Sequence, residues 1–281
     1  DMREPIFAGL FYEGSPAALR KQIRSCFLGK LGPGVLPAKS GRNSILGAVV
    51  PHAGYSYSGM CAAWAYKEIS ETHGLETVII LGTSHSGMGS GLLLDDWKTP
   101  LGIVKTDVEL AKEIIRGGEI RENFLAHQRE HSIEVQLPFL KFISPKVKIV
   151  GIVADRDLDY KKAGATIMDA IKNLKRKAVV LASSDFTHYG PEYGYVPFFE
   201  NVKERMRELD MKAVELIIKG DDAGLLGYVV RTGATICGVL PIVTMLKTIQ
   251  FKKAELLNYY TSGDLTGSYR NAVGYASIIF R

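Results

Sequence analysis

Short, wholly apolar runs rich in β-branched residues alternate along this chain with longer amphipathic stretches. Strands that are apolar throughout are typical of a parallel sheet covered by helices on both faces. The alternation therefore predicts an α/β fold with a mainly parallel central sheet flanked by helices. The apolar runs are residues 45–50, 77–81, 148–153 and 178–182, and the helical patterns between them are 59–70, 107–116, 131–142 and 160–174.

The two ends of the chain add further elements. Ser15 before Pro16 predicts the start of a helix that ends near Gly29. Pro138 predicts a kink in the helix at 131–142. No linker or repeat interrupts the pattern, so we expect one domain over residues 1–281. The remaining expected elements are a hairpin-like excursion at 92–104, helices at 202–219 and 235–249, and closing strands at 255–260 and 273–280, with an antiparallel edge around a turn-rich loop at 262–267.

Charge and cysteine usage narrow the expected partners and location. The net charge is +5, from 35 basic and 30 acidic residues, and the only basic cluster, at 172–177, is interpreted as a solvated helix end. We therefore expect no nucleic-acid partner. Cys26, Cys61 and Cys237 form no pair motif, which favours a reducing compartment and a cytoplasmic location. No apolar run approaches the roughly 18 residues of a membrane span, so we expect no membrane partner.

Three histidines directly follow apolar runs that are predicted to be strands. His52 follows 45–50, His85 follows 77–81, and His188 follows 178–182 after Asp185. In open α/β sheets, ligands bind outside the carboxyl ends of the strands, where the loops meet. The spacing therefore predicts a shared site for these imidazoles, with glycines and serines allowing tight loops. For each histidine alone, a hydrogen bond to loop backbone is the competing interpretation.

Two other segments carry reactive side chains. In AHQREHSIE (126–134), His127, His131 and Glu134 have spacings that place them on one face of a helix. The alternative is a capped helix start with local ion pairing. Cys237 lies in the first turn of the helix predicted at 235–249, where the helix dipole would lower the thiol pKa. The alternative for Cys237 is an inert buried thiol, as we expect for Cys26 and Cys61.

Seven separated motifs resemble those of the Memo family, in order and over essentially the whole chain. They are FAGLFY (7–12), PHAGYSYSG (51–59), LGTSH (81–85), EHSIE (130–134), SDFTHYG (184–190), TICG (235–238) and YYTSGD (259–264). The resemblance implies a fold shared with the class III extradiol ring-cleaving dioxygenases, which use non-haem iron. It also implies a metal site lined by His52, His85 and Cys237, with Asp185 and His188 beside it and His188 where the dioxygenases keep an acid/base histidine.

The implied ligand set departs from that of the dioxygenases, whose iron is held by two histidines and a carboxylate. Here the third position is Cys237. A thiolate is softer, and it suits copper, zinc or a redox-sensitive iron site. We therefore expect iron or copper, with zinc also compatible, and we do not extend ring cleavage to this chain.

Three function classes remain open. The first is a metal-dependent oxidoreductase in which His188 relays protons and Asp185 orients it. The second is a metal-free cysteine enzyme with Cys237 as nucleophile, His188 as base and Asp185 as orienter. The third is a non-catalytic module that binds a peptide or small molecule. Prokaryotic Memo proteins are associated with a radical-SAM enzyme, which the resemblance implies as a pathway partner.

Two geometric expectations follow. The ligand atoms of His52, His85 and Cys237 should lie within about 4–5 Å of one another, so that one ion reaches all three. His131 or Glu134 should point towards the pocket and support it. Tyr55, Tyr57 and Tyr189 are further candidates for its lining.

Overall fold

Four parallel strands form the centre of the molecule, as the apolar runs predict. The computed structural model describes residues 2–38, 41 and 44–281. Residues 77–83 pair in register with both neighbouring strands, with Ile80 opposite Leu181 on one side and Gly151 on the other. The predicted α/β fold with a mainly parallel central sheet is confirmed. In spatial order the four strands are β2 (Gly47–Val50), β8 (Ala178–Ser183), β3 (Thr77–Thr83) and β7 (Lys148–Ala154).

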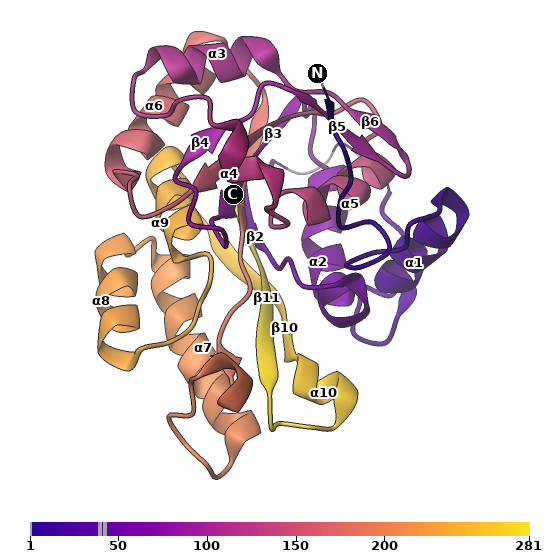
Figure 1. Ribbon diagram of the computed structural model, residues 1–281, viewed down its shortest axis with the longest axis vertical. Coiled ribbons are helices and arrows are strands. Elements are labelled where there is room, and N and C mark those ends of the chain that lie inside the picture. The colour runs from indigo at the N-terminus through magenta and orange to yellow at the C-terminus, as the bar shows by residue number, and fades with distance from the viewer. Residues whose placement is uncertain (1, 39–40, 42–43) are drawn as a thin grey trace.

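Antiparallel strands extend the sheet at both edges. The short β4 (Gly91–Leu92) pairs with β7. On the other side β11 (Ala272–Phe280) pairs with β2, and β10 (Ala254–Thr261) pairs with β11. The two long strands β10 and β11 run well past the rest of the sheet (Figure 1), where β9 (His188–Tyr189) also pairs with β11. The expected antiparallel edge is confirmed.

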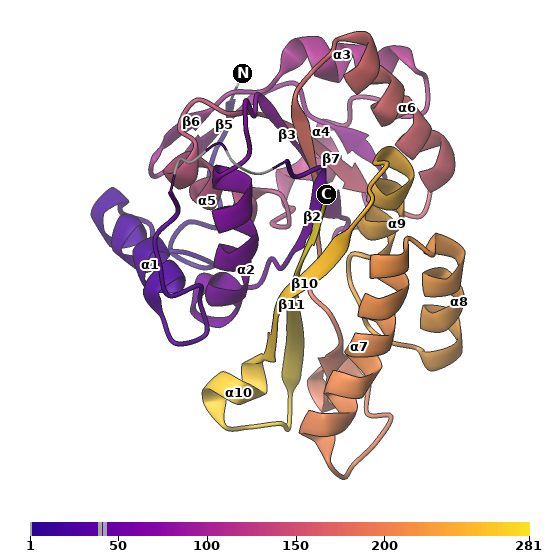
Figure 2. The same cartoon turned by 180° about the vertical axis from the view of Figure 1, so that it is seen from behind.

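Helices cover both faces of the sheet and bury two separate cores. Alternation along β3 divides its side chains, because Val78 and Ile80 face one core while Ile79 and Leu81 face the other. Figures 1 and 2 show the two helical layers on opposite sides of the sheet. The first layer contains α1 (Pro16–Leu28), α2 (Tyr55–Ser70) and α5 (Leu137–Ile143), and the second contains α3 (Val108–Arg116), α6 (Tyr160–Asn173) and α9 (Val239–Thr248).

The remaining elements surround this core. The predicted hairpin at 92–104 exists as a small separate sheet of β1 (Met2–Arg3), β5 (Asp96–Thr99) and β6 (Gly102–Val104). Helices α7 (Val202–Lys219) and α10 (Ser262–Thr266) flank the extended ends of β10 and β11, and α8 (Asp222–Thr232) packs against α7 and α9 (Figure 1). Among the described residues, no helix is both long and apolar enough to cross a membrane.

Three local predictions were wrong, each for an identifiable reason. The helix expected at 131–142 is instead a 3₁₀ turn, η1 (Glu134–Gln136), followed by α5. Pro138 stands in the first turn of α5, where proline is tolerated, and so it starts a helix instead of kinking one. Residues 262–267, expected to be a loop, contain α10, because Thr261 and Asp264 form a capping box.

A fourth difference concerns Cys237. The helix expected at 235–249 begins only at Val239, with Gly238 as its N-terminal cap. The preceding helix α8 (Asp222–Thr232) ends at Gly233, whose φ of 65° is in the left-handed region that favours glycine. Cys237 therefore lies in the loop between the two helices and not in the first turn of α9.

Candidate functional site

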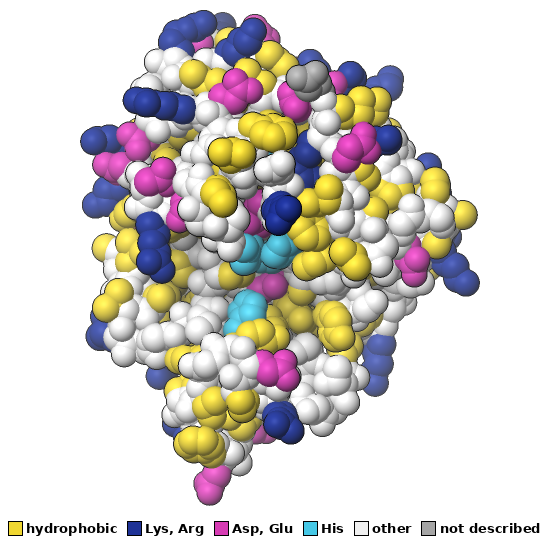
Figure 3. All heavy atoms as spheres, viewed as in Figure 1, with side chains coloured by type: hydrophobic (Ala, Val, Ile, Leu, Met, Phe, Trp, Pro, Cys, Tyr) yellow, Lys and Arg dark blue, Asp and Glu magenta, His cyan; other side chains and the backbone are white. Residues whose placement is uncertain are grey.

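A cleft of about 550 Å³ opens where the loops after β2, β3 and β8 meet. Figure 3 shows histidine side chains gathered in this hollow, with acidic side chains beside them. The described residues that line the cleft include four of the six histidines, and they come from every part of the chain. They are Phe11, His52, Ala53, Gly54, Tyr57, His85, His131, Asp185, His188, Tyr193, Ser262, Thr266, Asn271, Val273 and Tyr275.

His52 is buried, and a chain of hydrogen bonds fixes which of its nitrogens carries the proton. The Ser183 hydroxyl donates its only hydrogen to the Ser132 carbonyl, at 2.6 Å. It must therefore accept from its two other neighbours, the Gln136 amide nitrogen at 2.9 Å and His52 Nδ1 at 3.0 Å. The proton of neutral His52 is thus on Nδ1, and Nε2 keeps a free lone pair. Burial lowers the pKa of His52 to about 3, and His85 adds to this, so the ring is neutral at pH 7.

The ring proton of His85 is also held on Nδ1, but by a different partner. Its Nδ1 lies 2.9 Å from Glu130 Oε1, and its backbone N–H donates to Glu130 Oε2 at 2.8 Å. Glu130 is buried, and burial would raise its pKa. The hydrogen bonds from the His85 ring and backbone, together with the Ser132 N–H, outweigh that effect and lower the pKa to about 2. The carboxylate therefore holds the proton of His85 on Nδ1 and leaves Nε2 as the free donor atom.

Cys237 completes a group of three potential ligands. His52, His85 and Cys237 each offer one ligand atom, and these three atoms lie within 4.8 Å of one another, as the sequence predicts. Cys237 Sγ is 3.2 Å from His52 Nε2 and accepts the Asp185 backbone N–H, also at 3.2 Å. Burial raises the pKa of this thiol well above its usual range, and the charge of Asp185 adds to the effect. The expected lowering of the pKa by a helix dipole is therefore wrong.

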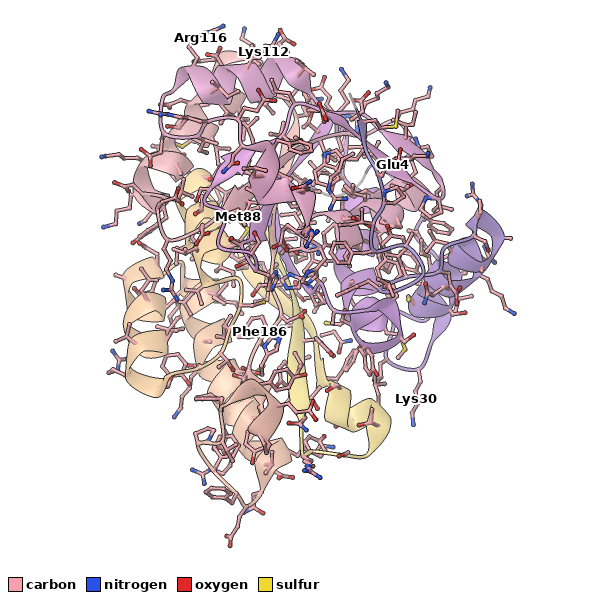
Figure 4. The ribbon with its side chains drawn as sticks, in the orientation of Figure 1. Glu4, Lys30, Met88, Lys112, Arg116 and Phe186 are labelled. Carbon is pink, nitrogen blue, oxygen red and sulfur yellow. The ribbon has the colours of Figure 1, made fainter. Side chains whose placement is uncertain are left out.

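Asp185 and His188 both line the cleft, but the structure orients them separately. Asp185 Oδ1 accepts the backbone N–H groups of His52 at 2.8 Å and Ala53 at 3.3 Å, and burial raises the pKa of this carboxyl. His188 Nδ1 faces the carbonyls of Phe186 at 2.9 Å and Thr235 at 3.1 Å, so its Nε2 is free. Phe186 lies beside β11 near the middle of the molecule (Figure 4). Among the described residues, no hydrogen bond joins Asp185 to His188, so Asp185 does not orient that ring.

Of the pocket residues expected from sequence, some reach the cleft and others do not. His131 lines it, and so does Tyr57. Tyr55 is buried and donates to the Val135 carbonyl at 2.5 Å, while Tyr189 stacks on Phe198 in a separate cluster. Both tyrosines follow a cleft residue by one to three positions, but their rings turn into the protein.

Glu134 also points away from the cleft. It is fully buried and pairs with Arg3, and it accepts the Phe7 N–H at 2.8 Å and the Tyr12 hydroxyl at 2.7 Å. His127 lies in the last turn of the short helix α4 (Phe124–Gln128), and its Nε2 faces the Gly91 carbonyl at 2.9 Å. The single helical face expected for His127, His131 and Glu134 is therefore wrong, because residues 129–132 are not helical.

Sequence reasoning missed the carboxylate that matters most here, Glu130. It directly precedes His131, and an acidic residue next to an expected site histidine was an available signal. Tyr193, Tyr275 and Asn271 were also missed. Tyr193 follows β9, Asn271 precedes β11, and Tyr275 lies in β11. The pairing of β9 with β11 brings these segments together.

The fold and this cleft define a class of α/β protein in which strand-end loops bring imidazoles and a thiol together. Comparison with known proteins identifies the family. The family model described as Memo-like protein matches residues 3–279. The chain belongs to the Memo family.

Similar proteins cover nearly the whole chain. A MEMO1 family protein of Methanopyrus kandleri is 41% identical over 290 residues, with 99% of each chain covered. A MEMO1 family protein of Methanocaldococcus jannaschii is 42% identical, with 99% of this chain and 98% of that one covered. Among solved structures, an uncharacterized protein of Escherichia coli K12 has a TM-score of 0.56 at 11% identity, covering 84% of this chain and all of that one. At that identity the likeness shows the fold alone.

Proposed function

We propose that this protein binds one iron or copper ion through His52 Nε2, His85 Nε2 and Cys237 Sγ, for redox chemistry on a small molecule in the cleft. The observation that carries the proposal is the convergence of the three donor atoms within 4.8 Å. An ion that bonds nitrogen and sulfur at about 2.0–2.3 Å can contact all three after small side-chain shifts.

The chemistry of the donors supports this assignment. Both imidazoles are held with their protons on Nδ1, by Ser183 and by Glu130, so each presents a lone pair without any rearrangement. The Cys237 thiol lies 3.2 Å from His52 Nε2, the nitrogen that carries no proton. A metal ion would take the place of the thiol proton in that contact, because a coordinated cysteine is a thiolate. Two imidazoles and a thiolate suit copper, zinc and redox-sensitive iron.

The surrounding residues supply binding and proton handling. The bound ion would provide redox or Lewis-acid chemistry. His188, whose Nε2 is free and whose ring lines the cleft, is the residue we assign to proton transfer. Asp185 anchors the backbone of His52 and Ala53 and so positions the loop that carries the first imidazole. The substrate would be a small molecule or a peptide end that fits between Phe11, Tyr57 and Tyr193.

The decisive test is the metal content of the protein purified under reducing, anaerobic conditions. We expect about one iron or copper per chain in the wild type. Cys237→Ser should weaken binding of copper(I), because a neutral hydroxyl lacks the charge and softness of sulfur. Cys237→Asp should shift the preference towards iron(II). Cys61→Ser, which changes a buried thiol outside the cleft, is the matched control. Wild-type affinity for both metals in Cys237→Ser would show that Cys237 is not a ligand.

Mild peroxide treatment sharpens this test. The metal-free thiol is half-buried and its pKa is raised, so it should react slowly. The metal-bound thiolate is the oxidisable form, and its oxidation should release the ion. Loss of metal and appearance of sulfenic or sulfinic acid at Cys237 would be followed together by mass spectrometry.

A metal-free cysteine enzyme is the second candidate, and one contact favours it. Cys237 Sγ lies 3.2 Å from His52 Nε2, so the base would be His52 and not His188 as the sequence suggested. Rapid alkylation of Cys237 in protein stripped of metal would support it. Saturable binding of a small ligand by metal-free protein with an unreactive thiol would instead support a non-catalytic binding module. Each class is compatible with the cytoplasmic location that three free cysteines favour.

A further inference from the structure

A second group of potential metal ligands lies beside the first and shares one residue with it. One donor atom each from His85, Glu130 and His131 lie within 4.8 Å of one another. Unlike the first group, this one contains no sulfur. Its members are two imidazoles and a carboxylate, a set that suits harder divalent ions such as iron(II) and leaves coordination positions open.

His131 is held by packing alone. Its ring lies 4.3 Å from the ring of His85, at an interplanar angle of 25°, and 4.6 Å from the ring of Phe11. Among the described residues, neither ring nitrogen has a hydrogen-bond partner within 3.5 Å, and the nearest carboxylate oxygen, Glu130 Oε1, is 3.7 Å from Nδ1. An imidazole that is fixed in place and lines a cleft with both nitrogens unbonded is available to a ligand.

Glu130 is a buried carboxylate that lacks a permanent cation. Its residue is 1% exposed, and within the described chain no lysine or arginine pairs with it. Oε1 accepts from His85 Nδ1 and from the Ser132 N–H, whereas Oε2 accepts only the His85 N–H. A carboxylate has about four lone-pair sites, so Oε2 retains one. A buried negative charge with an open lone pair beside an unbonded imidazole is a favourable place for a cation.

We propose that His85, Glu130 and His131 form a second cation position, which binds a divalent ion that prefers nitrogen and oxygen ligands. His85 belongs to both groups, and a neutral imidazole has only one nitrogen lone pair. Its Nδ1 is the nitrogen beside Glu130, so an ion shared with Glu130 at Nδ1 requires the proton to move to Nε2, which removes the lone pair that the first position uses. The two positions are therefore occupied alternately, the thiolate position by soft ions and the carboxylate position by harder ones. The inference rests on the proposed function only for this alternation, since the second group stands without Cys237.

Cobalt(II) alone distinguishes the two positions, because only a cobalt ion bound to sulfur gives a thiolate-to-metal charge-transfer band. The wild type should show that band. Cys237→Ser should still bind one cobalt ion per chain, without the band. In that background His131→Phe, which keeps the ring stacking but removes both nitrogens, should weaken binding by about 100-fold or more, since even residues that only support ligands contribute 10–100-fold.

The matched control is His52→Asn in the same Cys237→Ser background, which removes a ligand of the first position only. We expect cobalt affinity within a few-fold of the parent. Glu130→Gln repeats the His131 test if His131→Phe fails to fold by circular dichroism, and exposed His73→Ala controls for adventitious binding. Equal affinity of the Cys237→Ser parent and its His131→Phe derivative, or no cobalt binding by the parent, would overturn the proposal. Absence of the thiolate band in the wild type, together with equally tight copper(I) binding by the wild type and Cys237→Ser, would instead refute the proposed function and leave the second position standing.

Discussion

Glu134 and Glu130 are both buried and four residues apart, yet they serve different parts of the molecule. Glu134 receives the Arg3 guanidinium, the Phe7 N–H and the Tyr12 hydroxyl, all from the first twelve residues. Among the described residues, Glu130 receives only an imidazole and two backbone N–H groups, from the residues around the cleft. The comparison shows that the partner decides the role, since a guanidinium stays charged and has no lone pair to offer, whereas a neutral imidazole can present one to a metal ion.

The largest expected effect is on the fold, through Glu134. Replacing Glu134 with Leu leaves the buried Arg3 without its carboxylate, and breaking such a pair costs about 3–5 kcal/mol of unfolding free energy. The measurement is urea unfolding at pH 7. The double variant Arg3→Met with Glu134→Leu should be more stable than Glu134→Leu alone, because no unpaired charge remains. A loss below about 1 kcal/mol in the single variant would mean that the Arg3 bonds to the His127 and Glu130 carbonyls suffice.

The second effect is on the cleft, through Glu130. Glu130→Gln keeps the shape but removes the charge that holds the proton on His85 Nδ1. We expect metal affinity at the thiolate position to fall by about 10–100-fold, as is usual for partners of ligating histidines. Copper(I) titration under anaerobic conditions measures it, with Glu134→Gln as the matched control that should change affinity less. The comparison of the two glutamates would fail if both variants weakened copper binding equally.

The contrast also shows what the sequence alone could and could not predict. Apolar runs located the parallel strands, because full burial on both faces leaves no polar positions in them. The shared site of His52, His85 and Asp185 could then be predicted, because the carboxyl ends of parallel strands meet at one edge of the sheet. Glu134 was chosen over Glu130 because helical spacing was assumed through residues 129–132, which form no helix.

Other differences depend on tertiary contacts that no local pattern contains. The thiol pKa of Cys237 depends on burial against Asp185 and His52, from segments 52 and 185 residues away. Tyr55 and Tyr189 are close to cleft residues in sequence, but each hydroxyl finds a carbonyl inside the protein. Arg3, the ion-pair partner of Glu134, lies 131 residues earlier in the chain. Spacing rules describe neighbours within an element, and these contacts are between elements.

Asp210 extends the comparison to a buried carboxylate with only neutral donors. It lies in α7 and is fully buried. Oδ1 accepts the N–H of Thr187 at 3.1 Å and its hydroxyl at 2.6 Å, and Oδ2 accepts the Tyr259 hydroxyl at 2.7 Å. Burial raises the pKa of Asp210 to about 6, although these hydrogen bonds act in the opposite direction. Among the described residues its hydrogen-bond donors are neutral, and the folded protein therefore holds this proton more tightly than the unfolded chain does.

The smallest expected effect is a pH dependence with a defined direction. The stabilising contribution of protonated Asp210 is fully present below about pH 3.9, the unfolded pKa, and is lost as the pH rises through about 6. Asp210→Asn removes this titration, so the wild type should lose about 1–2 kcal/mol relative to the variant between pH 4 and pH 6.5. Urea unfolding of both proteins across that range isolates the effect, since the other titrating groups are common to both. A constant difference between the two proteins at all pH values would show that Asp210 titrates normally, and neutral hydrogen bonds would then suffice to keep a buried carboxylate charged.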